Sequence, residues 1–264
     1  MEEFLHFLQG EMEKPGILSW FHLIGFVLVV AATFLVSFFF HDTKEKTYKR
    51  ILFITWISLI VLEVFKQLIK AFHYGNPSTW SLSIIDFPFN ICSMVYYFLP
   101  IIIFVNRERF PRIVDAAIGY MCLLSLFAGV AVCVYTDMVM SNLIFTNVQS
   151  LVHHGQQVVI GVYIYVWNRR NVTVKTCHRS LIAFAITAVI AIIINVSFYP
   201  NVINMFFINP LNLTPIPFAK VIQEKAGFVV YFLGYLVAIV AITYLVYLIE
   251  TSIYKATLKK RKTT

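Results

Sequence analysis

The hydrophobic positions of this chain fall into seven long, nearly continuous stretches that are separated by polar linkers. A helix needs about 20 largely apolar residues to cross roughly 30 Å of hydrocarbon. The stretches that meet this requirement cover residues 17–40, 50–73, 87–105, 113–135, 145–167, 180–199 and 227–254. Their apolar residues do not alternate with polar ones, as they would in an outer-membrane barrel. The pattern predicts an all-α, polytopic integral membrane protein with one seven-transmembrane-helix domain.

The segment 200–226 is long and only partly apolar, and it contains the pairs Asn209-Pro210, Thr214-Pro215 and Ile216-Pro217. A residue that precedes proline is pushed out of the helical region. We therefore predict an ordered external loop here rather than a helix.

Composition supports the membrane assignment. The chain is 59% hydrophobic and 13% charged, whereas soluble domains carry roughly 25% charged residues. The four cysteines are scattered without a CxxC pair, so neither a disulfide framework nor a zinc site is indicated. No metal and no cofactor are expected.

The basic residues indicate the orientation of the bundle. Sixteen of them lie in the linkers after the first, third and fifth spans and in the tail: Lys44, Lys46, Lys49, Arg50, Arg107, Arg109, Arg112, Arg169, Arg170, Lys175, Arg179, Lys255, Lys259, Lys260, Arg261 and Lys262. Only Lys14, Lys220 and Lys225 fall on the opposite side. Positive loops stay cytoplasmic, so we predict an outside N-terminus and a cytoplasmic C-terminus in a multi-pass protein of the cell (plasma) membrane. Topology thus explains the net charge of +8 without a nucleic-acid partner.

Several polar side chains within the spans share one predicted depth. At a rise of 1.5 Å per residue, the following lie roughly 6–15 Å below the outer ends of their spans: Glu63, Lys66, Cys92, His153, His154 and Asn195. Gln67 belongs to the same region of the second span, and Asn90 and Ser93 flank the cysteine. Polar residues at membrane depth usually face the bundle interior. A layer of them in the outer half predicts a membrane-embedded site that opens outward.

The fifth span carries the densest polar pattern. Gln149, His153 and Gln156 share one helical stripe, and Ser150, His154 and Gln157 share the next. Such groups commonly serve interhelical hydrogen bonds, each worth about 0.6 kcal/mol. Two adjacent histidines among these polar partners also suggest a chemical role for one of them. The spacing does not choose between His153 and His154.

Cys92 has two interpretations. A free cysteine often packs as a small hydrophobe, which is our expectation for Cys122 and Cys133. Cys92 instead lies near the outer mouth of its span, at the depth of the histidines, where a neighbouring base favours the thiolate and makes it a nucleophile. Glu63 and Lys66, three residues apart, form either a simple buried ion pair or, with a histidine, a triad-like arrangement.

The residues Leu62-Glu63-Val64-Phe65-Lys66-Gln67, the segment Phe87–Ser93 with Cys92, and Leu99-Pro100 form a pattern that resembles the bacterial YwaF-type membrane proteins. These are similar to the transmembrane-protein-164 acyltransferases of animals and, more distantly, to the androgen-induced-gene family of lipid hydrolases. The resemblance implies that Cys92 accepts an acyl group and that His154, or its neighbour His153, is the base. Asn90 stands where the bacterial pattern usually has histidine.

These observations lead to one main hypothesis and two rivals. The main hypothesis is an acyltransferase or lipid hydrolase that takes its acyl group from membrane phospholipids through a thioester on Cys92. Glu63 would orient the histidine, and Asn90 or Asn195 would donate to the oxyanion. Lys66, Gln67, Ser93, Gln149 and Gln157 would contact the substrate. The rivals are a non-enzymatic lipid or small-molecule binding protein or transporter, and a scaffold whose polar residues only join helices. The sequence carries no indication of oligomeric state.

Overall fold

The computed structural model describes residues 2–201 and 203–263. Helices dominate it, with a two-residue antiparallel strand pair at one end. In chain order the elements are α1 (Glu2–Leu8), α2 (Trp20–Phe40), α3 (Glu45–Ala71), β1 (Phe72–His73), β2 (Thr79–Trp80), short 3-10 turns at Ile84–Asp86 and Cys92–Met94, α4 (Val95–Phe104), α5 (Pro111–Gly119), a π-helical segment Tyr120–Ser125, α6 (Leu126–Val134), α7 (Ile144–Asn168), α8 (Val174–Ser197), a 3-10 turn Met205–Phe207 and α9 (Pro217–Thr263).

Five of these helical stretches are long and apolar enough to cross a membrane: α2, α3, the continuous run from α5 to α6, α8 and α9. The all-α, polytopic membrane class is therefore correct. The other two predicted spans differ from these five. One is the short apolar helix Cys92–Phe104, and the other is α7, which is 25 residues long but carries the polar stripes. Seven crossings remain a prediction.

Two helices differ in extent from the predicted stretches. The third predicted span starts at 87, but helical structure begins only at Cys92, because Pro88 holds Phe87 in an extended conformation. The segment after 200 is also not loop throughout, since α9 already begins at Pro217. Proline is tolerated at the first helical position, where its missing N–H is not needed. Gly227, at φ +82°, then divides α9 into a short first part and the long apolar part that was predicted.

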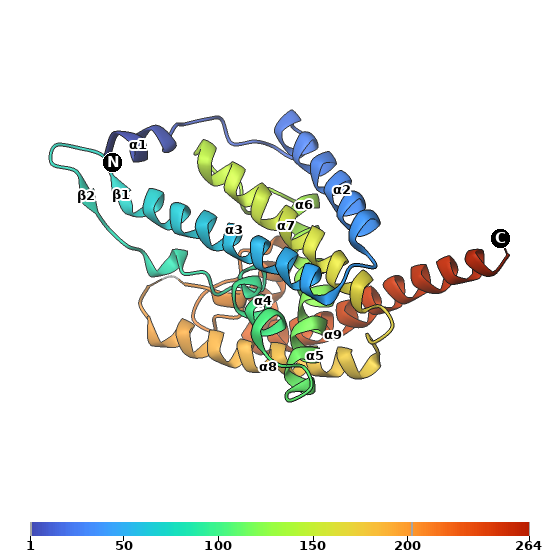
Figure 1. Ribbon diagram of the computed structural model, residues 1–264. Helices are drawn as coiled ribbons and strands as arrows, with labels where there is room; N and C mark the ends of the chain where they lie inside the picture. Colours follow the sequence, from blue (N-terminus) through green and yellow to red (C-terminus); the bar gives the residue numbers. More distant parts are fainter. Residues whose placement is uncertain (1, 202, 264) are drawn as a thin grey trace.

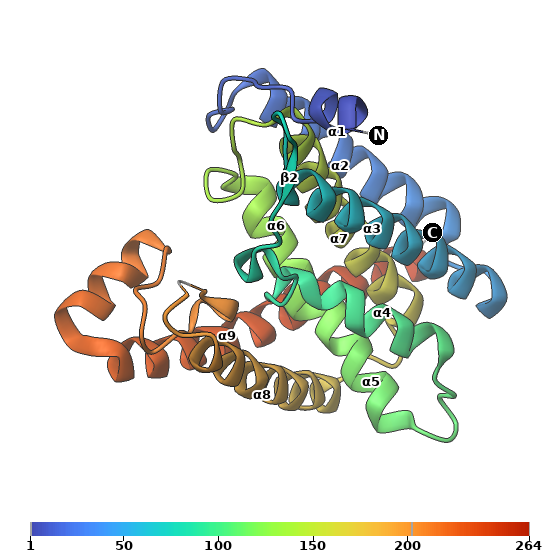
Figure 2. The same ribbon diagram turned by 90° about the vertical axis from the view of Figure 1, so that its left-hand side faces the viewer.

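Helix α7 packs against α2, α3 and α6, and Figure 1 shows α2, α7 and α3 side by side. Figures 1 and 2 both show α8 along the lower edge of the bundle, on the side away from α2. Small residues allow the close approach of α2 and α7. A Cβ on Gly155 would lie 2.6 Å from Val29 Cγ2, and one on Gly25 would lie 2.8 Å from Leu151. Glycine at a helix contact is a common device in membrane bundles, where packing drives association.

The linkers gather at two ends of the bundle. At one end Arg169 pairs with Asp42 at 3.3 Å, its guanidinium lies 5.7 Å from the ring centre of Tyr254, and Trp167 Nε1 donates to the Thr43 carbonyl. At the other end Lys14 pairs with Asp137 at 2.9 Å, and Gln9 donates to the carbonyls of Ile69 and Phe72. Parts of the predicted cytoplasmic linkers thus lie at one end of the bundle. We call the end that contains Asp42, Arg169 and Tyr254 the basic end. Figure 1 shows the two chain termini apart, with the C-terminal part of α9 extending beyond the bundle.

Candidate functional site

Glu63 of α3 is the centre of a polar cluster inside the bundle. Its side chain is only 10% exposed, and its Oε1 lies 2.7 Å from Lys66 Nζ. Gln67 Nε2 donates to the same oxygen at 2.7 Å and also to the carbonyl of Asp86 at 2.6 Å. Glu63 and Lys66 therefore pair on one helical face, as their spacing predicted, and Gln67 joins them. The donors that hold the Glu63 carboxylate are thus at the i+3 and i+4 positions of the same helix.

Tyr96 of α4 connects this carboxylate to the fifth predicted span. Its hydroxyl donates to Glu63 Oε2 at 3.1 Å and lies 3.0 Å from His153 Nδ1. A phenol has one proton, so when it goes to Glu63 the histidine must donate from Nδ1. In this tautomer the lone pair of the His153 ring is on Nε2. The order Glu63, Tyr96, His153 is that of a carboxylate that orients an imidazole through an intervening hydroxyl.

The sequence interpretation missed Tyr96. Tyrosine is common among the apolar residues of this chain, which has 14 of them, so its type carries no signal. The available clue is its position four residues after Cys92, which places both on one face of the helix. Only the approach of α7 shows that this face meets a histidine.

Cys92 lies beside the end of this relay. The backbone of Cys92 is a neighbour of the His153 ring, and the Gln157 side chain is a neighbour of the Cys92 thiol. All four cysteines belong to the described residues, and Cys92 is partly exposed whereas Cys122, Cys133 and Cys177 are buried. Among the described cysteines, Cys92 thus combines partial exposure with imidazole and amide neighbours.

His154 occupies a different environment. Its Nδ1 lies 2.8 Å from the Ser150 carbonyl and 3.3 Å from the Ser150 hydroxyl, one turn earlier on α7. Its ring packs edge-on against His153 at a centroid distance of 4.8 Å. Glu63 contacts neither histidine directly, and the path through Tyr96 leads to His153. The two histidines therefore differ in their hydrogen-bond partners, which the sequence alone did not show.

Gln157 of α7 connects this cluster to the π-helical segment Tyr120–Ser125. It is fully buried, and its Nε2 donates at 2.8 Å to Ser125, the last residue of the π-helical segment. Its Oε1 lacks a hydrogen-bond partner among the described residues. π-Helical turns are rare and often occur at functional sites. Here the extra residue per turn is found where the helix meets the Gln157 side chain.

Asn90 and Asn195 form hydrogen bonds with the turn at residues 205–207. Asn195 accepts from the Met205 N–H at 2.7 Å and donates to the Met205 carbonyl at 3.0 Å, and Asn90 accepts from the Phe206 N–H at 2.7 Å. Phe206 has a left-handed backbone, at φ +57°, so these bonds hold a strained turn. Both bonding ends of Asn195 are occupied. Of the two expected oxyanion donors, Asn195 therefore has its N–H engaged with the turn at 205–207, whereas Asn90 contacts this turn only through its acceptor Oδ1.

The remaining predicted residues lie around this cluster. Gln149 is buried on α7 one turn before His153, and Ser93 is half-buried in the turn that carries Cys92. Among residues 2–201 and 203–263, no group of three or more His, Cys, Asp or Glu side chains has the arrangement of a metal site.

The helices and this buried cluster define a polytopic α-helical membrane protein with a polar site embedded in its bundle. A comparison with family models matches residues 17–247 to the TMEM164 family. The match covers most of the chain, so the protein belongs to the TMEM164 family, in agreement with the resemblance in the second, third and fifth predicted spans. Neither curated proteins nor solved structures give a match.

Proposed function

We propose that this protein is a phospholipid acyltransferase that works through a thioester on Cys92. The observation that carries the proposal is the chain of contacts from Glu63 through Tyr96 to His153, with Cys92 four residues before Tyr96 at the start of the same helical segment. A nucleophile, a base and a group that orients the base are the parts that covalent acyl transfer requires. His153 takes the role of base, because it is the histidine that the relay reaches.

The first half-reaction transfers the acyl group to sulfur. His153 Nε2 takes the proton of the Cys92 thiol while Sγ attacks the carbonyl carbon of a phospholipid ester. The tetrahedral intermediate collapses by breaking the bond to the glycerol oxygen, which leaves with the proton from His153. The products are a lysophospholipid and a thioester on Cys92.

The second half-reaction regenerates the thiol. His153 removes the proton from the hydroxyl of a lysolipid, or from water in a hydrolase, and that oxygen attacks the thioester. Sulfur leaves and recovers the proton from His153. Partial exposure of Cys92 allows an ester carbonyl to approach sideways from the lipid. By our topology prediction this is the outer leaflet.

Lys66 supports the binding of substrate in this proposal. Its side chain is 20% exposed while it pairs with Glu63, so we assign it to a lipid phosphate at the interface. Gln157 beside the thiol orients Sγ, and Asn90 and Asn195 act indirectly by holding the turn at 205–207.

The test is a lipid-resolved transfer assay on the purified protein in liposomes that contain phosphatidylcholine with a labelled acyl chain and a lysolipid acceptor. Cys92→Ala should abolish transfer and the acyl adduct seen by intact-mass analysis. The matched control is Cys133→Ala, which removes a buried thiol on α6 and should retain activity. Unchanged transfer in Cys92→Ala would refute the thioester. Bound lipid without any adduct on the wild-type protein would favour a binding protein.

A further inference from the structure

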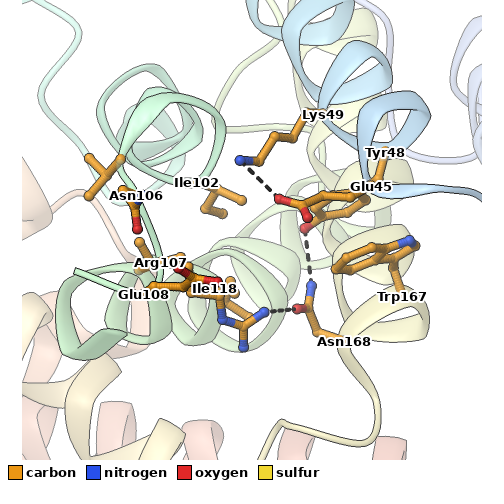
Figure 3. Close-up of a pocket in the computed structure, with 12 residues that line it drawn as sticks. Glu45, Tyr48, Lys49, Ile102, Asn106, Arg107, Glu108, Ile118, Trp167 and Asn168 are labelled. Carbon is orange, nitrogen blue, oxygen red and sulfur yellow. Dashed lines mark hydrogen bonds and ion pairs between the residues drawn. The ribbon is translucent and has the colours of Figure 1, made fainter. Parts of the chain in front are cut away.

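A second polar site lies at the basic end of the bundle. It is a cavity of about 430 Å³ between the start of α3, the linker from α4 to α5 and the end of α7. Figure 3 shows polar groups from these three places around the opening. Its wall residue Ile102 follows Cys92 by ten residues, or roughly 15 Å of helix, so the cavity is separate from the Cys92 cluster.

Arg107 is the cation that the fold positions in this cavity. Its Nη1 donates to Asn168 Oδ1 at 3.0 Å, and Asn168 Nδ2 donates to the Tyr48 hydroxyl at 3.0 Å. Tyr48 in turn stacks on Trp167 at a centroid distance of 4.1 Å. These contacts set the direction of the guanidinium through two buried residues. Within the described part of the chain, Arg107 forms no ion pair with a carboxylate.

The remaining charges balance one another. Lys49 pairs with Glu45 at 3.0 Å in an exposed contact, which contributes little stability and leaves the ammonium free to move. Glu108 lines the cavity from the exposed linker. Two cations and two carboxylates give a lining with no net formal charge, which matches a zwitterion better than a multiply charged anion.

Chemistry and location together identify the class of ligand. A guanidinium has five N–H donors in a fork that suits phosphate oxygens, and Arg107 uses one of them. The apolar side of the cavity includes Ile102, Val105, Val114 and Ile118, which continue into the apolar surfaces of α4 and α5. Such a site has room for a charged headgroup with the start of its acyl chains against the apolar wall.

We propose that this cavity binds the headgroup of a zwitterionic phospholipid, with its phosphate on Arg107 and Lys49 and its primary amine on Glu108. The ligand is a phosphoethanolamine lipid of the leaflet at the basic end. A soluble phosphate compound shares the phosphate chemistry but does not use the apolar wall. This site is independent of the acyl-transfer proposal.

Native mass spectrometry of the full-length protein in detergent tests the proposal, with short-chain phosphatidylethanolamine, short-chain phosphatidylglycerol and O-phosphorylethanolamine as the probes. The Cys92→Ala background prevents any contribution from acyl adducts. Arg107→Gln should weaken phosphatidylethanolamine binding by about tenfold or more, since a charge-assisted fork to phosphate is lost. The matched control Arg109→Gln removes a nearby charge that lies over the Phe110 ring instead, and binding should change by less than about twofold.

A second variant keeps the test decisive if Arg107→Gln folds poorly. Glu108→Gln changes an exposed side chain and should remove the preference for phosphatidylethanolamine over phosphatidylglycerol. The proposal is overturned if the Arg107 variant binds like the wild type, or if Glu108→Gln leaves the preference unchanged. Equal affinity for O-phosphorylethanolamine and the lipid would replace the lipid with a soluble ligand.

Discussion

The hydroxyl of Tyr96 lies 3.0 Å from Nδ1 of His153 and donates to Glu63 Oε2 at 3.1 Å. One phenol on α4 thus links a carboxylate on α3 to an imidazole on α7. Because its only proton is engaged with the carboxylate, the hydroxyl fixes which ring nitrogen of His153 carries a hydrogen. This relation is the basis of the first prediction.

Tyr96→Phe should lower the rate of acyl transfer by about tenfold to a hundredfold, because the ring of His153 loses the group that sets its tautomer. Tyr97→Phe is the matched control, since Tyr97 is exposed and its hydroxyl donates to the Pro88 carbonyl outside the relay. The measurement is single-turnover formation of the acyl adduct. Equal rates for both variants would show that Tyr96 has no part in positioning the base.

The two histidines make a second, separate prediction. His153→Gln should reduce adduct formation at least as strongly as Tyr96→Phe, since it removes the base itself. His154→Gln should retain more activity, because its Nδ1 bonds to its own helix at Ser150. Adduct formation in each variant is compared at equal amounts of folded protein, and the reverse order would assign the base to His154.

The Glu63–Lys66 contact predicts a stability effect. Glu63→Gln leaves the partly buried Lys66 without its counter-ion, and breaking such a pair costs up to about 3 kcal/mol of the free energy of unfolding. The double variant Glu63→Gln with Lys66→Met removes both charges and should recover much of this loss. Urea or thermal unfolding in detergent gives the two values. A double variant no more stable than the single one contradicts a charge-based origin.

The contact between α2 and α7 predicts a packing effect. Gly155→Ala places a methyl group against Val29, where a Cβ has only 2.6 Å, and should destabilise the protein by about 1–3 kcal/mol. Gly234→Ala on α9 is the matched control, since nothing lies within 4 Å of the added Cβ. That change should be neutral or stabilise the helix by up to about 1 kcal/mol. Thermal unfolding of the two variants compares them directly.

The turn at 205–207 predicts a local effect. Asn195→Ala removes both bonds to Met205 and leaves buried backbone groups without partners, at a cost of about 1–3 kcal/mol. Hydrogen exchange should then rise in residues 203–208. The exposed Asn201 provides the control, because Asn201→Ala should leave that exchange pattern unchanged. Faster exchange spread evenly over the whole chain would instead indicate general destabilisation.

The sequence by itself determined the membrane class, most of the helical spans and the family. Long apolar stretches have one stable environment, and the spacing of Glu63, Lys66 and Gln67 within one helix is set by local geometry. The sequence also indicated which helices carry polar side chains at membrane depth. These are properties of single segments, and periodicity along the chain reports them.

Contacts between distant segments were decided only in the tertiary structure. The rotation of each helix about its own axis depends on what packs against it, so no local pattern shows that Tyr96 faces both Glu63 and His153, or that Asn195 is engaged with Met205. The cavity around Arg107 likewise needs the start of α3, the linker from α4 to α5 and the end of α7 to meet. Local composition thus determines which segments are apolar helices, whereas the contacts within the site depend on which faces the packed helices turn toward one another.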